Sequence, residues 1–172
     1  MKLQQSYTSE ITNIYDNFVD EEYHEQIRST LEGWEFPWFY QKTLTAGSLD
    51  ISAHGFNHWL TDDNDPLFSP LIAKMQETIG ASKCYRARAD MTLYNPYGYM
   101  HAYHTDAKRQ HRVCIYYVNE SDGVTIIRGD NVEHIHPKPN RMITFNGKYE
   151  HTGHSPRLTK SRILINANFS VN

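Results

Sequence analysis

The hydrophobic and polar positions of the chain follow two periods, and the change between them lies near residue 83. Before it, two segments repeat apolar residues every three to four positions, which is typical of one face of an α-helix. After it, short stretches alternate apolar and polar residues and are separated by Gly, Pro, Asn and Asp. This second pattern indicates β-strands. We therefore expect a partly helical N-terminal part, residues 1–82, followed by a β-rich core, residues 83–172.

Both expected helices carry start and stop signals. The first begins after Asp20, which precedes two acidic residues, and ends at Gly33. In the second, Ser69 is placed to cap the helix, Pro70 occupies the first position, and Gly80 follows the last apolar residue. Capping side chains accept hydrogen bonds from the free amides of a helix start, and Gly readily takes the left-handed conformation after a helix end.

Eight strands are expected in the β-rich core. They cover residues 84–94, 99–106, 112–118, 124–128, 131–136, 141–146, 151–155 and 162–169. Turn residues separate them roughly every 8 to 12 positions with no helix between, and eight such strands favour a double-stranded β-helix, the cupin-like jelly roll. The predicted fold class is mainly β with flanking α-helices. Because no repeat or linker divides the chain, we expect one domain over residues 1–172.

Alternation in two of these strands predicts which side chains face the core. In 162–169, one face carries Ile163, Ile165, Ala167 and Phe169, and the other carries Arg162, Leu164, Asn166 and Asn168. In 112–118, one face carries Val113, Ile115 and Tyr117, and the other carries Cys114, Tyr116 and Val118. Between the helices, residues 43–66 are rich in Gly, Asp and Asn without a strong period, and we interpret them as a lid over a pocket entrance.

Composition narrows the classes of partner and location. The net charge is −3 with scattered Lys and Arg, so no nucleic-acid partner is expected. No run of about 18 apolar residues occurs, which argues against a membrane span. With two cysteines, Cys84 and Cys114, and no signal segment, we expect a cytoplasmic protein. The sequence does not indicate an oligomeric state.

The histidines concentrate in one region, since seven of the ten lie between residues 101 and 154. His104 and Asp106 are two positions apart, so on a strand their side chains leave the same face about 7 Å apart. A third ligand must come from another strand, and His151 is the candidate. Two histidines and one carboxylate leave coordination positions open, as in non-haem iron oxygenases. The alternative is a chance His-x-Asp pair in a histidine-rich chain.

Neighbouring residues support this interpretation. Arg162 lies eleven residues after His151 at the head of the last strand, where its planar fork suits a carboxylate. A solvated surface arginine is the alternative. His154 is the rival for the distal metal ligand, but the spacing to Arg162 favours His151. His101 and Tyr103 have odd offsets from the proposed ligand at 104, so both are expected to face away from it.

The residues in this order resemble the 2-oxoglutarate/iron(II) oxygenase superfamily, in its prolyl-4-hydroxylase-like branch, from about residue 91 to 169. The signature is His-x-Asp, a distant His and an Arg about ten residues on. The run 114–119 resembles the strand that supplies a tyrosine to the co-substrate, which implies Tyr117. Tyr94 is similar to the tyrosine before a Pro-Gly turn, and 138–145 is similar to the strand before the distal histidine. Both tyrosines can equally be core residues.

The resemblance implies the cofactor, the co-substrates and the reaction. Iron(II) is bound by His104, Asp106 and His151, and 2-oxoglutarate by Arg162, Tyr117, Tyr94 and Asn166. With O₂, the reaction hydroxylates a substrate C–H bond and releases succinate and CO₂. Peptidyl proline is the leading substrate, with other peptides, proteins and small molecules open. The N-terminal part, with 36–40 and 68–71, is similar to small bacteriophage oxygenases.

Two departures and two alternatives remain. A single Gly123 stands where relatives often have two glycines, and the segment around it is shorter than in collagen or oxygen-sensing hydroxylases. The first alternative function is a cupin-like module that binds a metal or a small acid without redox chemistry. The second is a structural jelly roll of viral type, in which the histidines are incidental.

Overall fold

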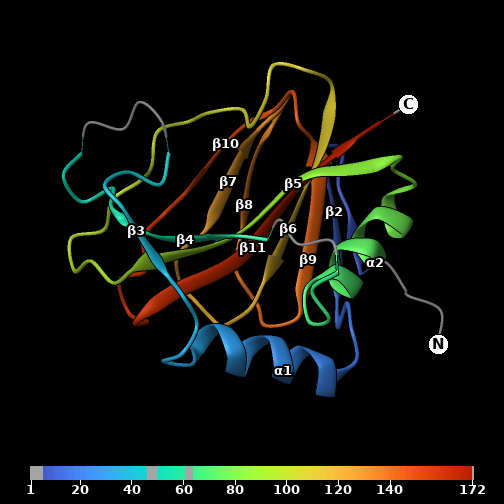
Figure 1. Cartoon of the computed structure of the whole chain (residues 1–172). Coiled ribbons are helices and arrows are strands. Elements are labelled where there is room, and N and C mark those ends of the chain that lie inside the picture. Colours follow the sequence, from blue (N-terminus) through green and yellow to red (C-terminus); the bar gives the residue numbers. More distant parts are fainter. Residues whose placement is uncertain (1–5, 46–49, 61–63, 172) are drawn as a thin grey trace.

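The computed structural model describes residues 6–45, 50–60 and 64–171. Its strands form two antiparallel sheets (Figure 1). The large sheet has the order β1 (Tyr7–Thr8), β2 (Thr12–Asp16), β9 (Arg141–Asn146), β6 (His111–Tyr117), β11 (Ser161–Ser170), β5 (Lys83–Leu93), β4 (Gly55–Trp59) and β3 (Phe39–Gln41). The small sheet has the order β10 (Glu150–Gly153), β7 (Thr125–Arg128) and β8 (Val132–Ile135). This confirms the predicted jelly roll.

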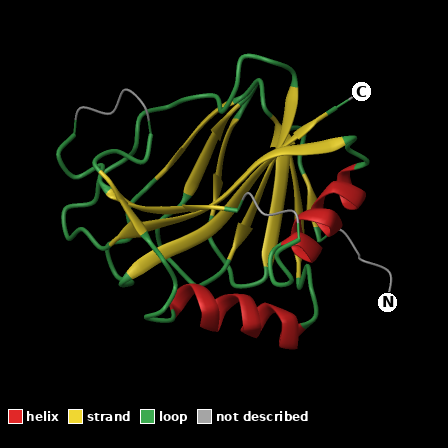
Figure 2. Cartoon of the chain, in the orientation of Figure 1, coloured by secondary structure: helices red, strands yellow, loops and turns green. Residues whose placement is uncertain are grey.

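The large sheet separates two apolar cores. One core packs the large sheet against both helices, α1 (Glu21–Glu32) and α2 (Ser69–Ile79), which lie outside the strands (Figure 2). The other fills the space between the two sheets. The alternation predicted for β11 and β6 is confirmed, because Ile163, Ile165, Ala167 and Phe169 join the first core with Cys114, Tyr116 and Val118, whereas Leu164 joins the second with Val113, Ile115 and Tyr117.

The helix signals are confirmed with one correction. The Asp20 side chain accepts a hydrogen bond from the backbone amide of Tyr23, and Gly80 has a φ of 62° after α2. Ser69, however, is the first residue of α2 rather than its cap. The amides before this helix are instead satisfied by Asp65, whose Oδ1 accepts from Leu67 and Phe68. Asp65 lies upstream of the periodic segment, so the pattern did not indicate it.

The N-terminal part is less helical than expected. It contributes β1 and β2 to one edge of the large sheet, and β3 and β4 to the other. These strands are two to five residues long, too short for a clear period. Of the expected lid, 46–49 and 61–63 lie outside the described residues, and Gly55–Trp59 is paired with β5. No helix in the described parts of the chain is long and apolar enough to cross a membrane; a cytoplasmic location stays a prediction.

The predicted strand 99–106 is wrong as a regular strand. It touches the small sheet through two isolated bridges, Met100 with His154 and His104 with His151. Between these bridges, the segment from Met100 to His104 has three residues, whereas the segment from His151 to His154 has two. The extra residue is a bulge, and a one-residue slip changes which side chains face inward.

Candidate metal and co-substrate site

Three side chains predicted as metal ligands meet beside the small sheet. One ligand atom each from His104, Asp106 and His151 lies within 4.8 Å of the others. The Nε2 atoms of both histidines are each 3.7 Å from an Asp106 carboxylate oxygen. The two imidazole rings have centroids 4.5 Å apart. Residues separated by more than forty positions therefore form one cluster of donors.

The backbone fixes the two histidines relative to each other. His104 N donates to His151 O over 3.1 Å, and His151 N donates to His104 O over 2.9 Å. Each Nδ1 lies beside a carbonyl two residues before it, that of Ala102 at 3.1 Å and that of Tyr149 at 3.4 Å. A proton held on Nδ1 by these carbonyls leaves Nε2, which faces Asp106, as the lone-pair donor to a metal.

Asp106 is held as a carboxylate by its surroundings. Its side chain is 2% exposed, and it accepts hydrogen bonds from Arg86 Nη1 and from Asn166 Nδ2, each at 3.3 Å. Burial alone would raise the pKa of this carboxyl, but the charges of His151, Arg86 and His104 and the Asn166 hydrogen bond lower it below its usual range. An ionised carboxylate is the form that binds a metal.

His151 is kept neutral by burial. Removal from water is the main cause that lowers its pKa to about 4, and nearby Asp106 opposes the shift. The rival ligand, His154, is not part of the cluster. Its Nδ1 lies 2.7 Å from Ser155 O, and the bridge to Met100 places it on the far side of the bulge.

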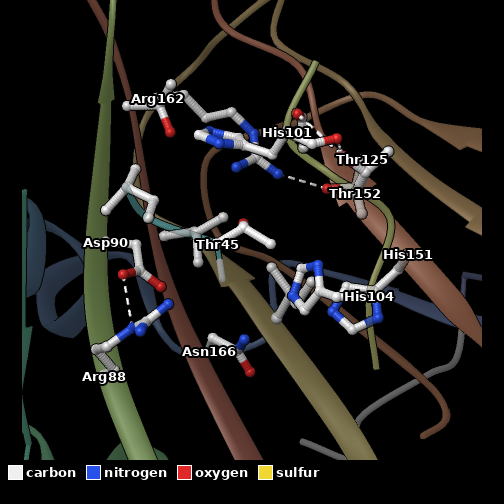
Figure 3. Close-up of a pocket in the computed structure, with 15 residues that line it drawn as sticks. Thr45, Arg88, Asp90, His101, His104, Thr125, His151, Thr152, Arg162 and Asn166 are labelled. Carbon is white, nitrogen blue, oxygen red and sulfur yellow. Dashed lines mark hydrogen bonds and ion pairs between the residues drawn. The ribbon is translucent and has the colours of Figure 1, made fainter. Parts of the chain in front are cut away.

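A cavity between the two sheets adjoins this cluster (Figure 3). Its walls come from β5, β6 and β11 of the large sheet and from β7 and β10 of the small one, and Leu44 and Thr45 lie over it. His104 and His151 of the cluster lie at one end of the cavity, and Arg162 lies at the other (Figure 3). Arg162 and Asn166 are four residues apart on one face of β11, which is about 13 Å along a strand.

Arg162 is buried without a carboxylate partner. It is 5% exposed, its Nη2 donates to Thr125 Oγ1, and its Nε has no hydrogen bond to any described residue. Among the described side chains, no Asp or Glu lies within ion-pairing distance of it. Burial lowers the pKa of this guanidinium, which nevertheless stays charged. A buried cation with free donors facing a cavity is costly unless an anion binds there.

Two glycines leave room for this guanidinium. A Cβ on Gly123 would lie 2.5 Å from His154 O and 3.0 Å from Arg162 Cδ, and one on Gly153 would lie 3.2 Å from Arg162 Nη1. The single glycine at 123 thus has a steric reason in this chain. Any side chain there would displace the arginine or the backbone of the distal strand.

His101 also faces the cavity, although the sequence predicted that it faces away. The bulge between Met100 and His104 explains the error, because the offset rule assumes a regular strand. His101 is 5% exposed, and neither ring nitrogen has a hydrogen-bond partner in the described structure. Burial, followed by the charge of the nearby Arg162, lowers its pKa to about 4, so the ring is neutral. Figure 3 shows it beside the arginine.

The remaining predicted co-substrate residues take three different positions. Tyr117 is fully buried, its hydroxyl lies 2.7 Å from Thr125 Oγ1, and the Arg162 guanidinium lies 5.8 Å from its ring centroid. Asn166 lines the cavity beside Asp106. Tyr94 is 51% exposed and does not line this cavity, because β5 ends at Leu93 and the chain turns away.

Comparisons with known proteins identify solved structures that share this fold. A scan against protein-family models finds no match, and a search of curated proteins finds none either. Among solved structures, an oxidoreductase of the 2OG-Fe(II) oxygenase family from Burkholderia pseudomallei matches with a TM-score of 0.70 and 13% identity, over 92% of this chain and 84% of that one. A Trichoplax adhaerens prolyl hydroxylase, solved with a peptide fragment of hypoxia inducible factor, matches with a TM-score of 0.72 and 12% identity, over 94% and 84%.

A Pseudomonas putida prolyl-4-hydroxylase matches with a TM-score of 0.66 and 13% identity, over 92% of each chain. The chain therefore has the fold of the 2-oxoglutarate/iron(II) oxygenases, as its sequence predicted. Within that fold, prolyl hydroxylases are among its structural neighbours. The likeness to bacteriophage enzymes stays a prediction.

Proposed function

We propose that the protein is an iron(II)- and 2-oxoglutarate-dependent dioxygenase that hydroxylates a C–H bond of its substrate. The observation that carries this proposal is the pairing of two features in one cavity. Two imidazoles and a carboxylate, from His104, His151 and Asp106, meet at one end. A buried guanidinium without an anionic partner, Arg162, lies at the other. A dicarboxylate that bridges a metal and an arginine satisfies both.

The donor set fits iron(II). Its ligand atoms are two imidazole nitrogens and a carboxylate oxygen, and the cavity opens on one side of them. Iron(II) bound there supplies open coordination positions for 2-oxoglutarate and O₂. In the overall reaction, one oxygen atom of O₂ enters the substrate C–H bond and the other enters succinate, while CO₂ leaves.

The protein residues hold the reactants in place. Arg162 and the Thr125 hydroxyl bind the far carboxylate of 2-oxoglutarate. Tyr117 holds both in position, because its hydroxyl contacts Thr125 and its ring faces the Arg162 guanidinium. The neutral His101 offers one N–H to the same carboxylate, which would relieve its missing hydrogen bond. Asn166 and Arg86 orient the metal-binding carboxylate of Asp106.

The rest of the chain supports this site as one domain. Strands from residues 1–82 complete both edges of the sheet whose centre comes from 83–172, so we propose that the chain works as a single unit. For the substrate we keep a peptidyl proline as one candidate, supported by the Trichoplax neighbour that was solved with a peptide. At 12% identity, the likeness to that neighbour supports the fold of this chain more strongly than its substrate.

Succinate formation tests the proposed function. Purified protein with iron(II), O₂ and 2-oxoglutarate should release succinate slowly without substrate, and a chelator should abolish it. Asp106→Ala and His104→Ala should lose iron binding and succinate release together. A cupin-like binding module would bind metal without producing succinate, and a purely structural jelly roll would bind neither. Metal binding in the wild type with no binding of 2-oxoglutarate would contradict the proposal.

A further inference from the structure

An ion pair on the β5 wall of the cavity has no part in the chemistry above. Arg88 Nε lies 2.7 Å from Asp90 Oδ1, and both residues line the cavity (Figure 3). They are two positions apart, so both project from the same face of β5. The alternate residues Ala87 and Ala89 project from the opposite face into the helix-side core. The strand thus presents two opposite charges side by side to the cavity.

This ion pair is incompletely satisfied. Asp90 is 8% exposed, and its contact with Arg88 is the one ion pair or side-chain hydrogen bond that its carboxylate makes to the described residues. This contact uses Nε of Arg88 and does not require the terminal nitrogens of the guanidinium. Buried charges in folded proteins normally carry several hydrogen bonds. Free donor and acceptor positions that face a cavity indicate a ligand.

The charges of the cavity limit what this ligand can be. Arg88 and Asp90 neutralise each other, as Arg86 and the metal-binding Asp106 do. A substrate group with a net charge, placed against Arg88 and Asp90, would therefore meet one opposite charge and one like charge in a buried space. A lone carboxylate would favour Arg88 and repel Asp90, and a lone ammonium would do the reverse. An uncharged group with an acceptor next to a donor satisfies both.

The pair lies between the metal cluster and the surface. Across the sheet, Asn166 on β11 is opposite Arg88 on β5, and Arg88 is opposite Trp59 on β4. Asn166 donates to the metal-binding Asp106. Adjacent strands are about 4.8 Å apart, so this row runs about 10 Å outward from β11 to β4. It ends at the half-exposed Trp59 indole, whose ring centroid is 5.7 Å from the Arg88 guanidinium.

We propose that Arg88 and Asp90 form the substrate subsite and that they bind an uncharged amide group. The amide C=O accepts from the Arg88 guanidinium, and the amide N–H donates to the Asp90 carboxylate. The neighbouring carbon then lies toward the metal cluster, and Trp59 packs against the part of the substrate that extends outward. This inference rests on the proposed oxygenase function, because it places the group next to the reacting carbon.

Binding of small probes tests the class of group. Wild-type protein is loaded with Mn²⁺ and 2-oxoglutarate without O₂, and binding is measured by calorimetry. Each amino acid is offered in four forms: N-acetyl amide, N-acetyl acid, free amide and free amino acid. At least one N-acetyl amide should bind about tenfold more tightly than its charged forms. A capped tripeptide that binds more tightly still indicates a peptide substrate, and equal affinity indicates a small carboxamide.

Substitutions test the residues. Arg88→Gln and Asp90→Asn should each weaken binding of the N-acetyl amide about tenfold, while 2-oxoglutarate affinity stays unchanged. The double variant removes both charges, so it leaves no unpaired buried ion and keeps the fold. Lys83→Gln, at the exposed start of β5, is the matched control and should bind like the wild type.

Three results would overturn the subsite: unchanged amide binding in the double variant, preference for a charged form, or no binding of any N-acetyl amide by protein that binds 2-oxoglutarate. Failure of the proposed function is distinct. In that case 2-oxoglutarate itself does not bind in the presence of Mn²⁺, whereas amide binding that depends on Arg88 and Asp90 would survive.

Discussion

His104 and His151 form a hydrogen-bonded pair across two chain segments, exchanging both of their backbone N–H···O bonds. In an antiparallel pair, two directly opposite residues that exchange both bonds have Cα atoms about 5.5 Å apart, and their side chains leave the backbone on the same side. The distance between the two imidazoles is therefore set by the backbone and not by the metal. We infer that the site is formed before metal binds.

Replacing the distal histidine should remove the metal site. His151→Gln is expected to lower affinity for Fe²⁺ or Mn²⁺ by more than about 100-fold, since loss of even an outer partner costs about 10- to 100-fold. His154→Gln, three residues on, is the control and should keep the affinity. Calorimetry under anaerobic conditions measures both. Equal losses in the two variants would contradict the ligand assignment.

The buried arginine should set the requirement for 2-oxoglutarate. Arg162→Lys keeps the charge but loses the planar fork, so the KM for 2-oxoglutarate should rise about 10- to 100-fold, as expected for the loss of about 1.5–3 kcal/mol. Metal affinity should not change. The exposed Arg157, changed to Lys, is the matched control. An unchanged KM for 2-oxoglutarate in Arg162→Lys would show that another residue binds the far carboxylate.

His101 should affect the co-substrate without supporting the fold. His101→Phe replaces a buried ring that has two unsatisfied nitrogens with an apolar ring of similar shape, which is often neutral or stabilising. We expect an unchanged or higher Tm together with a several-fold higher KM for 2-oxoglutarate. His101→Asn, which retains an N–H donor, should recover part of the KM. A lower Tm with a normal KM would indicate a purely structural residue.

Acid sensitivity of the fold should depend partly on His24. This helix α1 residue is 2% exposed, its Nδ1 lies 2.7 Å from the Tyr116 hydroxyl, and burial is the main cause that lowers its pKa below 6.5. As pH falls through 6.5, the unfolded chain takes up the proton first, so stability present above that pH is lost. His24→Gln should show a smaller loss of unfolding free energy between about pH 7 and about pH 5.

Denaturant unfolding at several pH values measures this difference. The exposed His134, changed to Gln, is the control and should follow the wild-type pH dependence. Parallel curves for the wild type and His24→Gln would mean that protonation of this buried ring does not limit acid stability.

The sequence pattern correctly predicted the regular strands, in which successive side chains point to opposite faces of the sheet. In β6 and β11, strict alternation assigned the apolar side chains of residues 113–118 and 163–169 to the correct core, and with them the cavity face that carries Arg162. The same rule failed at His101, because a bulge adds one residue that composition does not reveal. Tyr94 does not line the cavity, since β5 ends one residue before it, and its contact with the co-substrate stays a prediction.

Other features depend on contacts that no local pattern encodes. Nothing in the sequence around Arg162 indicates that its guanidinium is buried without an anion; this follows from packing against Thr125 and Gly153 from distant strands. The Arg88 and Asp90 pair is ordinary as a sequence, and it becomes a candidate subsite only because β5 borders the cavity. The short edge strands likewise owe their conformation to their partners.

The arrangement of those edge strands has a consequence for synthesis and truncation. β2 must wait for β9, which follows it by about 125 residues in the chain, and β4 must wait for β5, so these edge strands depend on partners that are synthesised after them. They also protect both margins of the sheet. Shortened forms that lack residues 1–60 would present two unpaired strand edges, β9 and β5, and we expect such forms to self-associate.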